Sequence, residues 1–134
     1  MPGPSTDTEP VAELPIDAAD MSSARRARAW ARDWLGGAVA PDAGHDLALV
    51  LSELVTNAVL HGSAPVLVRL TRTVVGVRVE VEDDSPALPR RRRIRPDAPG
   101  GRGLLLVASV SERWGVQRRA HGKRVWAELR LHLG

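Results

Sequence analysis

Residues 46–62, which read DLALVLSELVTNAVLHG, constrain the fold of this chain more than any other stretch. On a helical wheel at about 100° per residue, the apolar side chains form one arc about 140° wide, which indicates a helix packed on a core. They are Leu47, Val50, Leu51, Leu54, Val55 and Ala58. Glu53, Asn57 and His61 instead recur every fourth residue, so they form a row along the edge of this arc. We therefore expect these three side chains at the rim of the core.

A carboxylate and an amide one helical turn apart suit a defined chemistry. The Glu53 carboxylate can accept a proton or hold a water molecule. The Asn57 amide oxygen can bind a hard cation such as magnesium. The alternative is an ordinary solvated helix edge, and this stretch alone leaves both interpretations open.

Length and composition limit the class of protein. A chain of 134 residues and 14.5 kDa is large enough for one hydrophobic core and too small for two. The absence of cysteine excludes disulfides and thiolate metal sites. No apolar run approaches the roughly 20 residues that span a bilayer, and the acidic, proline-rich N-terminus does not resemble a secretory signal. We therefore expect a cytoplasmic protein that does not bind membranes.

The charge is uneven along the chain. The net charge is only +3, but arginines cluster between residues 90 and 95. Such a cluster can bind the phosphates of a nucleic acid. This interpretation is disfavoured because no regular basic helix accompanies the cluster, and the chain has neither Tyr nor Phe for base stacking.

The N-terminal half predicts a tail, an edge strand and two helices. Residues 1–10 have the composition of a disordered tail, and residues 11–16 are interrupted by Pro15, which suits an edge strand. Ser22 or Ser23 can cap a first helix that ends at the glycines after Leu35. Pro41 then opens the central helix, which we expect to stop at Gly62.

The second half changes from helical to alternating periodicity. Residues 66–71 and 77–82 alternate apolar and polar side chains around a turn near Gly76, which predicts a hairpin with one buried face. Residues 86–101 form a proline- and arginine-rich loop that is longer than a simple connection. A third helix is expected after Gly103, followed by two strands over residues 114–118 and 125–133 around a turn at His121 and Gly122.

The order of these features resembles the ATP-binding fold of the gyrase, Hsp90, histidine kinase and MutL superfamily. The segments ELVTNAVLHG, VEDDSP, GGRGLLLV and GKRVWAEL look most like the small bacterial anti-sigma-factor serine kinases, and the resemblance covers residues 12–133. It implies an α+β fold of the Bergerat type, a two-layer sandwich with about three helices on a mixed, mostly antiparallel sheet. It also implies that residues 11–134 form a single ATP-binding domain with a lid over residues 86–101.

The resemblance implies a role for each matching residue. Asn57 matches the magnesium ligand and Glu53 the general base. Asp83 matches the carboxylate that accepts a hydrogen bond from the adenine amino group. On the phosphate side the matching residues are Gly101, Gly103 and Leu104, the last through its backbone amide. ATP and Mg²⁺ are therefore the implied cofactors.

Two positions depart from the family pattern. Asp84, Ser85 and Pro86 stand where a glycine usually follows the adenine-binding aspartate of the superfamily, a sequence that the small anti-sigma-like relatives often show. Arg124 stands where relatives commonly have a threonine in the last strand. The second change removes a hydroxyl near the nucleotide, and we expect it to place a cation there instead.

The resemblance implies a regulatory protein serine kinase that acts as an anti-sigma factor. A lone ATP-binding domain must act on another protein, so the expected partners are a sigma factor and an anti-sigma-factor antagonist protein, with a homodimer left open. The first alternative is a nucleotide-dependent module that sequesters its partner without transferring phosphate. The second is a basic protein that binds nucleic acid through residues 90–95.

Overall fold

The computed structural model describes residues 11–16, 20, 22–36, 41–61, 65–85 and 103–131. The expected tail over residues 1–10 and the expected lid over residues 86–101 lie outside the described residues. Both remain predictions.

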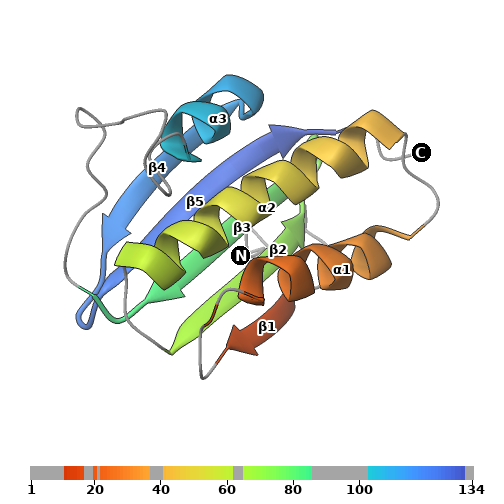
Figure 1. The fold of residues 1–134 in the computed structure, drawn as a ribbon. Helices are drawn as coiled ribbons and strands as arrows, with labels where there is room; N and C mark the ends of the chain where they lie inside the picture. The colour runs from red at the N-terminus through yellow and green to blue at the C-terminus, as the bar shows by residue number, and fades with distance from the viewer. Residues whose placement is uncertain are drawn as a thin grey trace, which may run out of the picture.

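Strands in the described part of the chain form one five-stranded sheet (Figure 1). They are β1 (Ala12–Ile16), β2 (Val66–Arg72), β3 (Gly76–Asp83), β4 (Arg113–Arg118) and β5 (Lys123–Arg130). Their spatial order is β1-β2-β3-β5-β4, which places β1 at an edge as predicted and β5 between β3 and β4. The expected mostly antiparallel sheet is antiparallel in every pairing between these strands.

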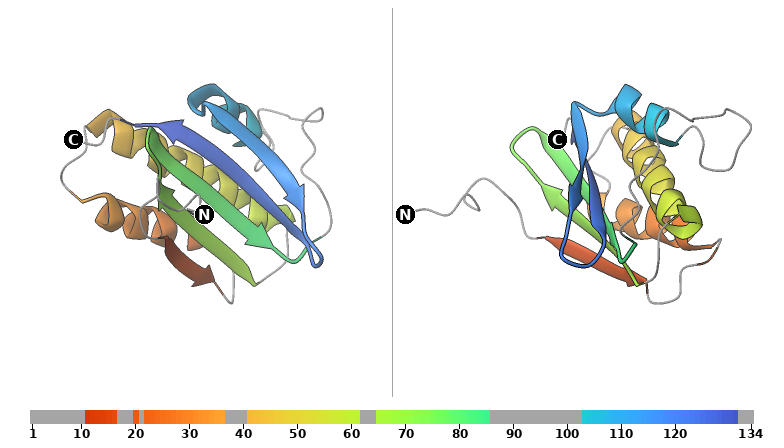
Figure 2. Two further views of the ribbon diagram at one scale, coloured as in Figure 1. Left: turned by 180° about the vertical axis from the view of Figure 1, so that it is seen from behind. Right: turned by 90° about the vertical axis from the view of Figure 1, so that its left-hand side faces the viewer.

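In the described ranges, three helices cover one face of this sheet and complete the expected two-layer α+β architecture (Figures 1 and 2). They are α1 (Ser23–Leu35), α2 (Pro41–His61) and α3 (Gly103–Val110). α2 packs against both α1 and α3, so it is the central element of the helical layer. Among the described residues, no helix combines the length and apolar character needed to cross a membrane.

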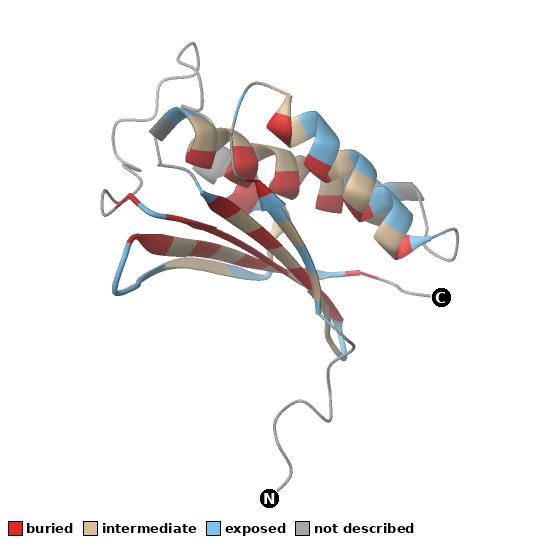
Figure 3. Cartoon of the chain, turned by 90° about the horizontal axis from the view of Figure 1, so that it is seen from below, coloured by how far each residue is buried: buried red, intermediate tan, exposed pale blue. Residues whose placement is uncertain are grey.

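The core lies between the two layers (Figure 3). Every apolar residue of the predicted α2 stripe is buried, from Leu47 to Ala58. Alternate residues of β2, β3 and β5 face this stripe and are also buried, namely Val66, Val68, Leu70, Val77, Val79, Val81, Val125, Ala127 and Leu129. Burying one such Val or Leu side chain contributes about 1.5–3 kcal/mol, so the matching periodicities of helix and strands determine how the layers pack.

The two ends of α1 make different polar contacts. Ser22 occupies the N-cap position, but its hydroxyl donates to Asp20 Oδ1 at 2.6 Å and makes no capping bond to the helix backbone. At the other end, Arg72 of β2 donates to the carbonyl oxygens of Trp34 at 3.4 Å and Leu35 at 3.3 Å. A cation at a helix C-terminus satisfies free carbonyls and interacts favourably with the helix dipole, so this contact ties α1 to the sheet.

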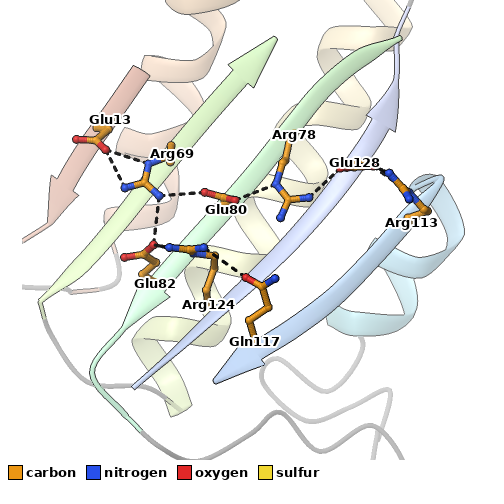
Figure 4. Close-up of polar contacts among 9 residues, drawn as sticks. All are labelled: Glu13, Arg69, Arg78, Glu80, Glu82, Arg113, Gln117, Arg124 and Glu128. Atoms are coloured by element: carbon orange, nitrogen blue, oxygen red, sulfur yellow. Dashed lines mark hydrogen bonds and ion pairs between the residues drawn. The ribbon is translucent and has the colours of Figure 1, made fainter. Parts of the chain in front are cut away.

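The opposite face of the sheet carries a network of alternating charges (Figure 4). Its members are Glu13, Arg69, Arg78, Glu80, Glu82, Arg113, Gln117, Arg124 and Glu128. Arg69 lies 2.9 Å from Glu13 on β1 and 3.0 Å from Glu80 on β3. Arg78 bridges Glu80 and Glu128, each at 2.8 Å. Opposite charges on neighbouring strands therefore support the pairing of the sheet.

Two glutamates in this network have lowered pKa values. Burial alone would raise the pKa of Glu80, but hydrogen bonds from Arg78 and Arg69 outweigh it and hold that pKa below its ordinary value. Burial likewise opposes the shift at Glu128, where hydrogen bonds from Arg113 and Arg78 lower the pKa. Both carboxylates are thus stabilised in their charged form by the folded sheet.

Candidate functional site

Asp83 ends β3 on the side of the sheet that faces the helices. It continues the inward row of Val79 and Val81, and only 2% of its surface is exposed. Lys123, the first residue of β5, is its register partner and is 4% exposed. Lys123 Nζ lies 3.1 Å from Asp83 Oδ1 and 3.0 Å from Oδ2. The predicted adenine-binding carboxylate is therefore half of a buried ion pair.

The chain turns away from the sheet immediately after Asp83. Asp83 Oδ1 accepts a hydrogen bond of 2.8 Å from the backbone N–H of Ser85, which forms an Asx turn over residues 83–85. Ser85 is itself buried. The turn fixes the orientation of the Asp83 carboxylate without the glycine usual at this point.

Gly122 allows β5 to begin close to the end of β3. Its φ is +100°, and a Cβ at this position would lie 1.9 Å from the Asp83 carbonyl oxygen. Only glycine combines this backbone conformation with so close an approach. The sequence predicted a turn at Gly122, but not that the turn packs against Asp83.

Glu53 and Asn57 lie on α2 at the predicted rim of the core. Both are partly buried, whereas the neighbouring Leu54, Val55 and Ala58 are buried. Within the described residues, neither side chain has a hydrogen-bonding partner or an ion-pair partner. Both side chains end in polar groups that can bind a ligand or a cation.

α3 begins at Gly103, as the sequence predicted, and packs against α2. The first four backbone N–H groups of a helix have no partner within the helix, so those of Gly103 and Leu104 suit an anion. Gly101, the other predicted phosphate-side glycine, lies outside the described residues, as do the side chains of Leu104 and His61.

The structure brings the predicted site segments to one part of the molecule. Figure 1 shows the C-terminal ends of α2 and β3 at the same end of the sheet, with α3 beside α2. α2 also contacts β3 directly. Glu53 and Asn57 lie in the C-terminal half of α2, on the same side of the sheet as Asp83.

A family model described as a histidine kinase-like ATPase domain matches residues 18–129. The chain belongs to this family. The match includes α2, Asp83 and the start of α3, so it confirms the superfamily resemblance drawn from the sequence motifs.

Two solved structures show how this histidine kinase-like ATPase domain relates to larger proteins. The chain is 26% identical, with a TM-score of 0.66, to the crystal structure of the RsbU and RsbW domains of Rv1364c from Mycobacterium tuberculosis, covering 92% of this chain and 33% of that one. It is 26% identical, with a TM-score of 0.52, to the Erythrobacter litoralis EL346 blue-light activated histidine kinase, covering 80% of this chain and 40% of that one. The chain thus spans less than half of either protein. Comparison with curated proteins gave no match.

The cation beside Asp83 differs from the one expected. The sequence pointed to Arg124, but that residue faces the outer side of the sheet, where its guanidinium lies 2.6 Å from Glu82. Lys123, one residue earlier, faces inward. The alternation of strand residues could have predicted this orientation. Lys123 lies two and four residues before the buried Val125 and Ala127, so its side chain points to the same face.

The donor groups of this ATPase domain fit a magnesium ion that arrives with a nucleotide. The described residues contain no cluster of three or more His, Cys, Asp or Glu side chains able to hold a metal. Asn57 supplies one amide oxygen at the rim. Mg²⁺ usually keeps several waters and binds through few protein oxygens together with substrate phosphates, so one protein oxygen is compatible with such an ion.

Proposed function

We propose that the chain is an ATP- and magnesium-dependent regulatory protein that acts as an anti-sigma factor and as a protein serine kinase toward an antagonist protein. Membership of the ATPase-domain family supports nucleotide binding. The buried Asp83 carboxylate, at the end of β3 and on the helix-facing side of the sheet, is the observation that best supports the proposal.

Asp83 suits the recognition of adenine. A carboxylate only accepts hydrogen bonds, and the amino group at position 6 of adenine donates one. Guanine carries a carbonyl at the same position, which repels a carboxylate. With guanine the carboxylate would face a second acceptor in place of a donor, which is unfavourable, so we expect Asp83 to select adenine over guanine.

Asn57 and Glu53 suit the phosphate end of the same nucleotide. Asn57 would contribute an oxygen ligand to Mg²⁺, which when bound to ATP neutralises charge on the phosphates. Glu53 lies one turn away and would accept the proton of a serine hydroxyl on the partner protein. The N–H groups at the start of α3 would hold phosphate oxygens.

Transfer of label from γ-labelled ATP tests the kinase assignment. The protein is incubated with Mg²⁺, labelled ATP and the proteins that copurify with it. We expect a labelled partner with the wild type and none with Glu53→Ala, which should still bind ATP. Glu112→Ala is the matched control, because Glu112 is an exposed carboxylate away from α2 whose partner is Arg130 at 3.3 Å.

The same experiment distinguishes the kinase from a binding module. A wild-type protein that binds ATP and retains its partner without labelling it would contradict the kinase assignment. That result would indicate nucleotide-dependent sequestration instead.

A further inference from the structure

The Asp83–Lys123 pair is more than a neutralised charge. A buried ammonium is unfavourable unless it is paired, and Lys123 is only 4% exposed. The described residues offer it one partner, Asp83. The alternation of residues along β5 places the side chain of residue 123 on the inward face of the sheet. This side chain is a lysine, and its ammonium group contacts the predicted base-binding carboxylate.

The hydrogen-bonding capacity of the pair is not exhausted. A carboxylate has about four acceptor sites. Asp83 Oδ1 accepts from Ser85 N–H and from Lys123, while Oδ2 contacts Lys123 alone, so Oδ2 keeps an acceptor site. An ammonium has three donors, and contact with one carboxylate uses at most two of them. Within the described part of the chain, the pair therefore keeps an unused acceptor and an unused donor.

We propose that Lys123 donates a hydrogen bond to N1 of adenine while Asp83 accepts one from the neighbouring amino group. N1 and the amino group lie side by side on one edge of adenine. N1 needs a hydrogen-bond donor, and the amino group needs an acceptor. Lys123 is then a specificity-determining residue, and the base is recognised by the ion pair and not by the carboxylate alone. This inference rests on the proposed ATP binding.

Calorimetric titration with three nucleotides tests the assignment. The probes are ATP, 1-deaza-ATP, which lacks the N1 acceptor, and purine riboside triphosphate, which lacks the amino group. Wild-type protein should bind 1-deaza-ATP at least about tenfold more weakly than ATP, because the Lys123 donor then has no partner. Equal affinities for these two nucleotides would overturn the role of Lys123 without any substitution.

Substitutions distinguish the contribution of Lys123 to base recognition from that of Asp83. Lys123→Met should lose the difference between ATP and 1-deaza-ATP, yet still prefer ATP over purine riboside triphosphate, which depends on Asp83. Arg124→Met is the matched control, because it removes a neighbouring cation on the outer face, and it should discriminate as the wild type does. Circular dichroism and the thermal midpoint report whether each variant is folded.

The outcomes also separate this inference from the proposed function. A folded Lys123→Met variant that still discriminates tenfold against 1-deaza-ATP would make Lys123 a purely structural partner of Asp83. Absence of any ATP binding by the wild type would overturn both the inference and the proposed function.

Discussion

Gly122 lies directly against the backbone of Asp83, so close that a Cβ on Gly122 would lie 1.9 Å from the Asp83 carbonyl oxygen. This contact joins the start of β5 to the end of β3. It brings Lys123 to the Asp83 carboxylate, since the residue after the glycine is the first of the strand. The position of the buried ion pair thus depends on a glycine with no side chain of its own.

Gly122→Ala should lower both stability and ATP affinity. The added methyl group meets backbone atoms, which cannot rotate away, so the strands must separate locally. We expect the free energy of unfolding in urea to fall by about 2–3 kcal/mol, in the range of other strained substitutions. Calorimetric titration should show weaker ATP binding.

Two other glycines serve as controls for this substitution. Gly36 also has positive φ, +73°, but a Cβ there would meet nothing within 4 Å, so Gly36→Ala measures backbone strain alone. Gly44→Ala adds a methyl group in open space within α2, where it should raise stability by about 0.5–1 kcal/mol. A loss for Gly122→Ala no greater than that for Gly36→Ala would contradict the steric account.

Removing Lys123 should leave the buried Asp83 carboxylate without its charged partner. Breaking a buried ion pair by deleting one partner costs about 3–5 kcal/mol, so Lys123→Met should be strongly destabilised. Adding Asp83→Asn to this variant removes the uncompensated charge and should recover part of the loss. Urea unfolding of the two single variants and the double variant gives the coupling between the residues. If the losses in free energy of unfolding of the two single variants add up to that of the double variant, Asp83 and Lys123 are not energetically coupled.

Acid should weaken the charged face of the sheet. The pKa values of Glu80 and Glu128 are lower in the folded protein than their ordinary value of 4.5, so the unfolded chain binds protons more readily. Their contribution to stability is therefore complete above about pH 4.5 and is lost as the pH falls through the folded pKa values. Urea unfolding between pH 6 and pH 3 should show this loss. Glu80→Gln should reduce the slope of the free energy of unfolding against pH. A slope unchanged in Glu80→Gln would exclude Glu80 as a source.

The fold was predictable wherever periodicity carried the information. The apolar stripe of α2 and the alternation in residues 66–71 and 77–82 predicted the central helix, the hairpin and their buried faces. The position of β5 between β3 and β4 was not predictable, because pairing between distant strands leaves no periodic signal. The outer charge network was missed for a related reason, since a charged residue such as Glu80 looks solvated until its cross-strand neighbours are known.

The site was predicted in part. The family motifs pointed to Asp83, Glu53 and Asn57, and the structure places these residues on the same side of the sheet. The motif comparison emphasised Arg124 and overlooked Lys123, although strand parity distinguishes the two. Gly101 lies outside the described residues, and the role of every residue in binding and catalysis stays a prediction.

Titration of the protein with ATP in Mg²⁺, repeated with a folded Asp83→Asn variant, tests adenine recognition by Asp83. Asparagine is nearly the same size as aspartate, but it lacks the charge and carries an amide that can donate to the base. We predict saturable binding by the wild type and an affinity at least about tenfold lower for the variant. Equal ATP affinity in the two proteins would contradict the assignment of Asp83 as the adenine-binding residue.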